Sequence, residues 1–190
     1  MGPGPEPRSR GTLHIASETS PSPGATGVRR VVALVIATAG GAGYAPIAPG
    51  TFGSAVGVLC FLPLAPLGAV AVLLVAALLL AVGTWSADET ERIYGKKDDG
   101  RIVIDEVVGQ LVTLAPVAAL GPRGGLDGAA FLLGGFLVFR LFDIWKPGPA
   151  RAAERNLPGG LGVMMDDVVA GLFSAVVVGA AALLYAGAGA

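Results

Sequence analysis

Two short segments of the chain each place a pair of adjacent acidic residues at the start of an apolar run. They read "VIDEVVGQ" (103–110) and "MMDDVVAG" (164–171), and in both the acids are followed by Val-Val and then by a glycine, directly in the first and one position later in the second. Acids in a first helical turn can simply complement the helix dipole. One acid would suffice for that role. Because an aspartate deep in a bilayer costs about 2.5–3.5 kcal/mol, the second acid in each segment indicates that the acids have a functional role and do not only stabilise the helix.

Four carboxylates without a nearby histidine or cysteine indicate a site built from hard oxygen ligands. The single histidine, His14, and the single cysteine, Cys60, lie elsewhere, so a catalytic scheme that needs a histidine in the core is excluded. Oxygen ligands suit Mg²⁺, and also Mn²⁺, better than zinc, and magnesium commonly bridges to phosphate oxygens. We therefore predict that the paired acids bind a metal and act in catalysis: Asp105, Glu106, Asp166 and Asp167.

The segment "FRLFDIWKP" (139–147) adds three charges at the end of an apolar run. Arg140, Asp143 and Lys146 recur at every third residue and share about a third of a helix circumference. They could form a salt-bridge ladder with a snorkelling lysine. The depth of Arg140 favours a phosphate site, because a guanidinium binds phosphate through two hydrogen bonds and a lysine adds a point charge. Asp143 is then either their counter-ion or a further metal ligand.

A Gly/Pro-rich passage, "APIAPGTFGS" (45–54), precedes another apolar run and is typical of a helix start. Free N–H groups and hydroxyls at such a start can hold an anion, which makes Thr51 and Ser54 candidate substrate-binding residues. A simple helix cap after a Pro-Gly turn explains the passage nearly as well, and the spacing of a nucleotide-binding loop is absent.

A membrane-embedded helical bundle must position these residues, because 53% of the chain is hydrophobic and only 14% is charged. Backbone polar groups in lipid must be satisfied within the segment, so we predict a compact all-α polytopic bundle with about four to five membrane helices. Pro63 and Pro66 should make the first hairpin short or kinked. The expected helices are 52–64, 67–85, 102–120, 128–146 and 167–188.

Charge distribution predicts how the bundle crosses the membrane. If successive helices cross the membrane in alternating directions, all of the 13 lysines and arginines except Arg123 fall on one side, together with both acidic pairs. The positive-inside rule makes this side cytoplasmic.

A net charge of −1 leaves no broad basic surface for nucleic acid. Residues 1–27, rich in Pro, Gly and Ser, are predicted to be a disordered tail, 28–190 a single membrane domain, and 88–101 a solvated, partly helical loop.

Three blocks of this sequence together resemble the bacterial phosphatidylglycerophosphatase A family. They are "GAGYAPIAPGTFGS", "IVIDEVVGQLVTL" and "FRLFDIWKPGPARAAERNLPGGLGVMMDDVVAG", they occur in the family's order, and the resemblance covers roughly residues 35–175. It implies a Mg²⁺-dependent enzyme of the bacterial cytoplasmic membrane that removes the terminal phosphate of phosphatidylglycerophosphate to give phosphatidylglycerol. At the matching positions it also implies that Arg151 and Asn156 belong to the site.

The residues narrow the mechanism of such a phosphatase. No Cys-x₅-Arg loop and no D-x-D-x-[TV] motif is present. Water activated at Mg²⁺ is therefore the hypothesis, with the paired acids as ligands or base and with Arg140, Lys146 and Arg151 around the phosphate. A carboxylate acting as the nucleophile is the alternative.

Three other classes of protein fit these residues less well than a phosphatase does. A CDP-alcohol phosphotransferase also uses interfacial acids and metal, but its D-x₂-D-G-x₂-A-R pattern is absent. A small transporter or channel would place acids along the depth of the bundle, whereas both acidic pairs are predicted at one face. A purely structural subunit leaves the repeated acidic pair unexplained.

Overall fold

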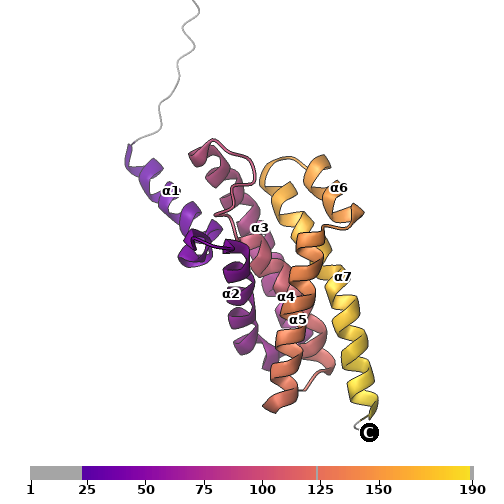
Figure 1. The fold of residues 1–190 in the computed structure, drawn as a ribbon. Helices are drawn as coiled ribbons and strands as arrows, with labels where there is room; N and C mark the ends of the chain where they lie inside the picture. The colour runs from indigo at the N-terminus through magenta and orange to yellow at the C-terminus, as the bar shows by residue number, and fades with distance from the viewer. Residues whose placement is uncertain (1–22, 123, 189–190) are drawn as a thin grey trace, which may run out of the picture.

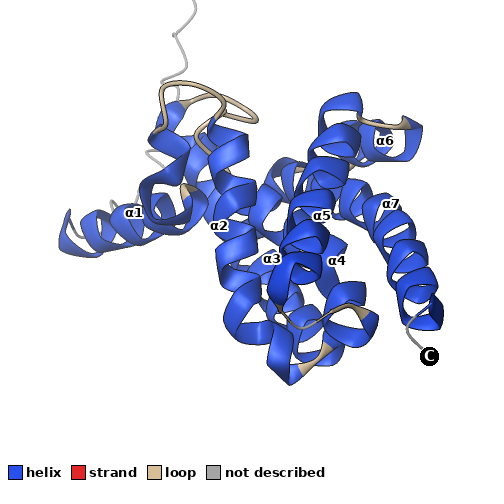
Figure 2. Cartoon of the chain, turned by 60° about the horizontal axis from the view of Figure 1, so that its bottom comes forward, coloured by secondary structure: helices blue, strands red, loops and turns tan. Residues whose placement is uncertain are grey.

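The computed structural model describes residues 23–122 and 124–188, and within these ranges the chain is helical with no strand (Figure 2). The predicted all-α fold is confirmed. The α-helices are α1 (Pro23–Ala37), α2 (Pro49–Leu64), α3 (Ala69–Tyr94), α4 (Ile104–Leu120), α5 (Gly125–Trp145), α6 (Gly148–Asn156) and α7 (Gly159–Ala188), and two short 3₁₀ helices are η1 (Ala39–Tyr44) and η2 (Ala65–Leu67).

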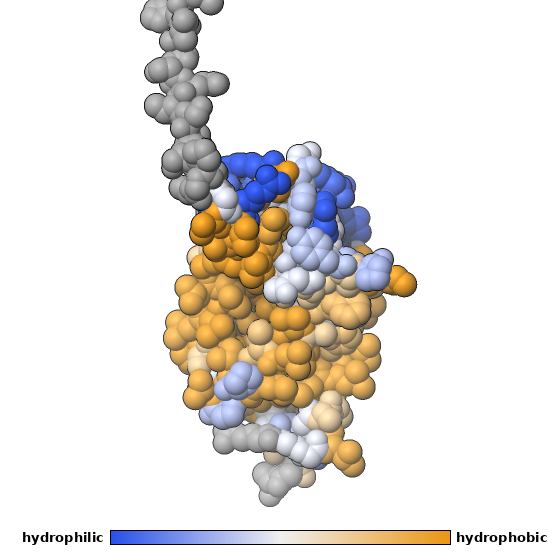
Figure 3. All heavy atoms as spheres, turned by 90° about the vertical axis from the view of Figure 1, so that its left-hand side faces the viewer, coloured by the Kyte–Doolittle hydropathy of each residue, from blue (hydrophilic) through white to orange (hydrophobic). Residues whose placement is uncertain are grey.

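Four segments are long and apolar enough to cross a membrane, and they lie side by side in the bundle (Figure 1). Seen from the α1 side, a broad hydrophobic band lies below a hydrophilic end (Figure 3). This arrangement agrees with the predicted polytopic membrane protein, because lipid-facing surface must be apolar while the bundle's ends meet water. The four segments are Pro49–Leu67, Ala69–Tyr94, Gly125–Trp145 and Gly159–Ala188.

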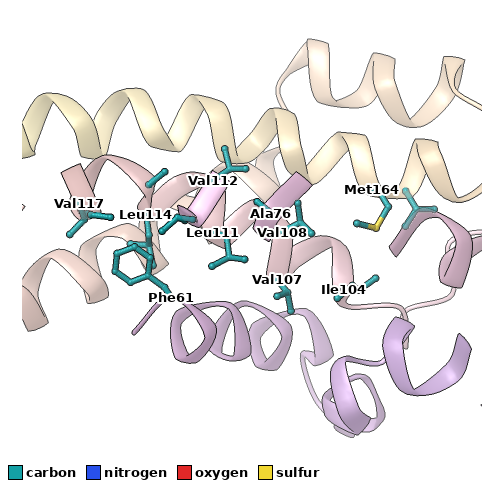
Figure 4. Packing of buried hydrophobic residues seen from close by; sticks show 14 of the residues in the cluster. Phe61, Ala76, Ile104, Val107, Val108, Leu111, Val112, Leu114, Val117 and Met164 are labelled. Carbon is teal, nitrogen blue, oxygen red and sulfur yellow. The ribbon is translucent and has the colours of Figure 1, made fainter. Parts of the chain in front are cut away.

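Helix α4 forms the centre of the bundle. It packs against α2, α3, α5 and α7, and most of its residues are buried. Its side chains make up much of the hydrophobic core, from Ile104 at one end to Val117 at the other, with Phe61 of α2 and Met164 of α7 packed beside them (Figure 4). An apolar helix with no exposed face belongs inside a bundle, and here its first turn carries one acidic pair.

Several helices extend beyond the apolar runs that predicted them. Helix α3 continues through the polar stretch to Tyr94, so residues 88–94 of the predicted loop are helical, and α7 begins at Gly159 instead of residue 167. Apolar patterning marks where a helix crosses the membrane, whereas Glu and Arg continue α3 readily in water. The start of α7 was missed for another reason, because it is rich in glycine, a poor helix former. The bounds of α4 agree with the prediction to within two residues.

The N-terminal region forms a helix that was not among the expected ones. Helix α1 begins at Pro23, so residues 23–27 of the predicted disordered tail are helical, as a proline in a first helical turn allows. The rest of that predicted tail, residues 1–22 with His14, and also Arg123 lie outside the described residues.

Candidate active site

The two acidic pairs, about 60 positions apart in the sequence, meet at one end of the bundle. Carboxylate oxygens of Asp105, Glu106 and Asp167 all lie within 4.8 Å of one another. The two aspartates are buried and Glu106 is largely so. Three hard oxygen donors this close together can coordinate one divalent cation.

A crossing of α4 and α7 brings these acids together. Gly109 lies one helical turn after Asp105, and Gly171 lies one turn after Asp167. A Cβ on Gly109 would lie 2.7 Å from the carbonyl oxygen of Asp167, and one on Gly171 would lie 2.6 Å from the carbonyl oxygen of Gly109. The glycines that the two motifs share are therefore the contact point, because any side chain there would hold the helices apart.

The acids line a cavity of about 330 Å³ that is built from five parts of the chain. Two of these are the α4 start and the α7 segment that carry the acids. The other three are the end of α5 with the residue after it, the start of α2, and the connection between α3 and α4. The charged residues at this cavity are Asp98, Asp105, Glu106, Arg140, Asp143, Lys146, Asp166 and Asp167.

Arg140 connects the acids to α2. Its guanidinium forms an ion pair with Asp143, lies 3.8 Å from an oxygen of Glu106, and donates a 3.4 Å hydrogen bond to the hydroxyl of Ser54. A Cβ on Gly50 would lie 3.0 Å from the same guanidinium nitrogen, so the first turn of α2 must lack a side chain at that position. Asp143 is thus the counter-ion of Arg140 in this structure, on the wall of the same cavity.

Two polar atoms of this cluster have no hydrogen-bond partner among the described residues. They are Nε of Arg140 and Oε2 of Glu106, both buried. A buried polar atom without a partner costs free energy, which a ligand between the guanidinium and the carboxylate would recover. The cluster is therefore complementary to a group that presents oxygen atoms or positive charge.

Lys146 follows the end of α5 in a left-handed backbone conformation, with φ of 45°. Its amine donates hydrogen bonds to Asp166 at 2.7 Å and to Glu154 of α6 at 3.1 Å. Burial lowers the pKa of Lys146, but these two hydrogen bonds raise it more, so its pKa lies above the ordinary value and the amine stays charged. Asp166 is thus tied to a cation, as Asp143 is.

Four predicted site residues do not line the cavity. Arg151 is exposed and donates hydrogen bonds to the carbonyl oxygens of Lys146 and Trp145, at 2.9 and 3.3 Å, which caps the end of α5. Asn156 is exposed at the end of α6, and Thr51 is half-buried in the first turn of α2. The structure brings the other predicted residues to the cavity or, for Ser54, to Arg140 on its wall.

The connection between α3 and α4 contributes a residue that the sequence did not single out. Asp98 lines the cavity, and its backbone N–H donates a 2.7 Å hydrogen bond to Glu91. Next to it, Asp99 accepts two hydrogen bonds from the guanidinium of Arg101, at 2.6 and 3.0 Å, and this pairing lowers the pKa of Asp99. A charged loop has no pattern that distinguishes a rim residue from a solvated one, so only the fold identifies Asp98.

Comparison with known proteins identifies relatives over most of the chain. The sequence model of the family "Phosphatidylglycerophosphatase A" matches residues 35–182. The phosphatidylglycerophosphatase A of Escherichia coli is 35% identical over 146 residues, which is 74% of this chain and 78% of that protein. The Haemophilus influenzae protein of the same name is 36% identical over 145 residues, covering 76% and 85%.

A third relative carries a different name. A putative phosphatidylinositol-3-phosphatase of Bacteroides thetaiotaomicron is 35% identical over 156 residues, covering 78% of this chain and 92% of that protein. No solved structure shows significant similarity to this chain.

Proposed function

Because the chain belongs to the phosphatidylglycerophosphatase A family, and so to a family of phosphatases, we propose that it hydrolyses the terminal phosphate of phosphatidylglycerophosphate in a Mg²⁺-dependent reaction. The observation that carries this proposal is the convergence of Asp105, Glu106 and Asp167 beside the guanidinium of Arg140. This arrangement places candidate metal ligands beside a group that can bind phosphate, and metal-dependent hydrolysis of a phosphomonoester requires both. Family membership favours this reaction over a CDP-alcohol phosphotransferase, a transporter or a channel.

The donor set fits Mg²⁺, or Mn²⁺ in its place. The three converging residues supply only carboxylate oxygens, and one oxygen of Glu106 has no partner among the residues that the structure describes. Asp105, Glu106 and Asp167 would hold the ion, which would supply Lewis acidity and lower the pKa of a bound water. We propose a different main role for Asp143 and Asp166. Each forms an ion pair with a basic side chain, Arg140 or Lys146, and so orients it.

Arg140 and Lys146 are proposed to bind the phosphate. Nε of Arg140 has no partner in the part of the chain that the structure describes, and the guanidinium lies 3.8 Å from Glu106, so it can reach a phosphoryl group held beside the acids. Lys146 provides a second fixed positive charge on the cavity wall. Ser54 holds the Arg140 guanidinium from the α2 side, and Arg151 holds the end of α5 from which Lys146 extends.

The position of the site suits a lipid substrate. The cavity lies at the ends of segments that are apolar enough to span a bilayer, so a phospholipid can present its headgroup there while its chains stay in the membrane. The lysine and arginine bias supports a location of this site on the cytoplasmic side, and the bacterial relatives support the inner membrane as its place. The name of the third relative, a phosphatidylinositol-3-phosphatase, agrees with a phosphomonoester on a phospholipid.

Phosphate release by the purified full chain tests this proposal. Vesicles of phosphatidylglycerophosphate, phosphatidic acid or phosphatidylinositol 3-phosphate are supplied with Mg²⁺ or with a chelator. We expect release from phosphatidylglycerophosphate that the chelator abolishes and that Asp105→Asn and Asp167→Asn reduce at least a hundredfold, as for lost catalytic groups. Asp127→Asn, at the opposite end of α5, is the matched control. Full rates in folded Asp105→Asn and Asp167→Asn proteins would show that the metal site is wrong.

Trapping of an intermediate separates the two candidate nucleophiles. If water attacks the phosphorus directly, no residue of the protein becomes phosphorylated during turnover. Hydrolysis of a phosphorylated carboxylate can deliver the same water oxygen to the released phosphate, so the distinguishing observation is the phosphorylated carboxylate itself, and its detection by rapid quench and mass spectrometry would replace water attack with the covalent alternative.

A further inference from the structure

Helix α1 carries its large apolar side chains on the outside. Four valines recur at the spacing i, i+3, i+4 and i+7, which places them on one helical face, and all four are exposed: Val28, Val31, Val32 and Val35. On the other side of the helix, Ala33 and Ala37 are fully buried, and α1 packs against α3 and η1. This valine stripe indicates a helix that is surrounded by an apolar medium and not by water.

Both ends of α1 are held at the polar end of the bundle. Near its start, the guanidinium of Arg29 lies 3.0 Å from a carboxylate oxygen of Glu89, in the polar last part of α3. At its end, the carbonyl oxygen of Ala37 accepts a 2.8 Å hydrogen bond from the backbone N–H of Val103, directly before α4. The acidic cavity lies at the same end of the bundle.

The length of α1 is too small for a membrane crossing. Its 15 residues measure about 22 Å, whereas the hydrocarbon core of a bilayer is about 30 Å thick. Figure 2 shows that α1 extends away from the four long segments of the bundle, so most of its outer face meets no other helix of the described chain. Its valine stripe is therefore exposed at the level where a bilayer changes from chains to headgroups.

A positive charge stands beside this stripe. Arg29 pairs with Glu89, but Arg30 is exposed and forms no ion pair with the residues that the structure describes. Basic residues together with an apolar stripe are typical of a helix in the headgroup region, where the stripe meets the upper parts of the acyl chains and the charge meets lipid phosphates. Figure 3, which looks onto the α1 side, shows hydrophobic surface that continues upward from the broad band beside the hydrophilic end.

We propose that α1 is an interfacial helix in the leaflet that faces the acidic cavity, with its valine stripe against lipid and Arg30 beside an anionic phospholipid headgroup. Two observations favour lipid over a second copy of the chain: the stripe continues the lipid-facing surface, and the charge of Arg30 is complementary to an anionic headgroup. Most of α1 precedes residues 35–182, which the family model matches, and its contact with lipid does not depend on the proposed phosphatase reaction.

Quenching by brominated lipids measures the depth of the stripe. Cys60 is the only cysteine of the sequence, so a Cys60→Ser background allows a fluorophore to be attached at one chosen position. The positions are the valine stripe, the middle of the apolar part of α3 and the exposed connection after α3, through Val31→Cys, Leu78→Cys and Lys97→Cys. The full-length protein is placed in vesicles whose lipids carry bromine either near the top of the acyl chains or near their ends.

The three probes should report three different depths. We expect shallow bromines to quench the Val31 probe severalfold more than deep ones, deep bromines to quench the Leu78 probe more, and neither to quench the Lys97 probe. If Val31 is quenched as little as Lys97, water or protein such as a second copy covers the stripe, and the proposal is overturned. Quenching of Val31 mainly by deep bromines would also overturn it, because α1 would then lie in the bilayer core. Val35→Cys, on the same face, gives an independent second position.

Two brominated lipids that differ only in headgroup test the charge. Phosphatidylglycerol and phosphatidylcholine, with bromines at the same shallow depth and at the same mole fraction, report which lipid lies beside the Val31 probe. We expect the anionic lipid to quench at least twofold more strongly, and Arg30→Gln to bring this ratio close to one. Arg155→Gln, exposed on α6, is the matched control and should leave the ratio unchanged.

The headgroup comparison also has outcomes that contradict the proposal. Equal quenching by the two lipids in the protein that retains Arg30, or an unchanged ratio in Arg30→Gln, would exclude an anionic headgroup beside this residue. None of these measurements requires turnover, so their results do not depend on whether the protein hydrolyses phosphatidylglycerophosphate.

Discussion

Gly109 of α4 and Gly171 of α7 face each other where their helices cross, so closely that a Cβ on Gly171 would lie 2.6 Å from the carbonyl oxygen of Gly109. Each glycine follows an aspartate of the carboxylate cluster by one helical turn. The separation of the helices at this crossing therefore determines the separation of Asp105 and Asp167, and small residues at the crossing are a condition for the site.

Gly171→Ala should separate α4 from α7 and damage both stability and activity. Forcing a methyl group against backbone costs about 1–3 kcal/mol, and the displaced carboxylates should lower phosphate release at least tenfold. Gly134→Ala of α5 is the control, because a Cβ there meets nothing within 4 Å and alanine favours a helix. Thermal unfolding in detergent and phosphate release measure both effects. Equal behaviour of the two variants would contradict the role of the crossing.

Arg140→Lys should lower kcat/KM at least tenfold although it keeps the charge. A lysine amine cannot pair with Asp143 and also present two parallel donors to a phosphate, as a guanidinium can. Arg155→Lys, exposed near the end of α6, is the matched control. A variant that retains its activity would show that only the positive charge matters at this position.

Removing one carboxylate should have opposite effects on stability with and without metal. The acids at Asp105, Glu106 and Asp167 repel one another when no cation lies between them, so Asp167→Asn should unfold at a higher temperature than the unsubstituted protein in a chelator. Added Mg²⁺ should stabilise the unsubstituted protein, since an ion that binds only the folded state raises its stability, and should not stabilise Asp167→Asn. The same Mg²⁺-dependent increase in both proteins would place the ion elsewhere.

Arg151→Ala should lower activity only about two- to fivefold. Its guanidinium caps the end of α5 through the carbonyl oxygens of Lys146 and Trp145, and lost caps have modest effects. Lys146→Ala should cost far more, because the cavity loses a charge and Asp166 loses its ion-pair partner. If Arg151→Ala matches Lys146→Ala in kcat, Arg151 contacts the phosphate itself, as its sequence motif implies.

The Asp99–Arg101 pair should make stability depend on pH in acid. Its hydrogen bonds from Arg101 lower the pKa of Asp99 in the folded protein below the ordinary value of 3.8. The stability that the pair contributes is therefore complete above this ordinary pKa and is lost as the pH falls through the folded value. Asp99→Asn should unfold at a lower temperature at pH 7, and the difference should shrink as the pH falls below about 4. A difference that stays constant with pH would exclude this ion pair as its cause.

Much of the fold was predictable from residue patterns because lipid imposes strict rules on a backbone. The all-α class follows from long apolar runs, and the bounds of α4 were predicted to within two residues. The ends of α3 and α7 were not, because polar residues continue α3 without an apolar signal, and the glycines of "GGLGVMMD" (159–166) conceal the start of α7. The tight crossing at Gly109 and Gly171 is visible in the sequence only as a shared glycine, whose meaning depends on the partner helix.

By itself the sequence determined which chemistry is available: carboxylates without histidine or a usable thiol, cations at helical spacing, and apolar segments that keep them at a membrane surface. Only the tertiary structure decided which of these groups converge and which form ion pairs with each other. Asp105, Glu106 and Asp167 converge, while Asp143 and Asp166 pair with Arg140 and Lys146, and Arg151 turns away to cap α5. The reason is physical, since residue types fix charge and donor chemistry, whereas distances between helices depend on how closely their backbones can pack.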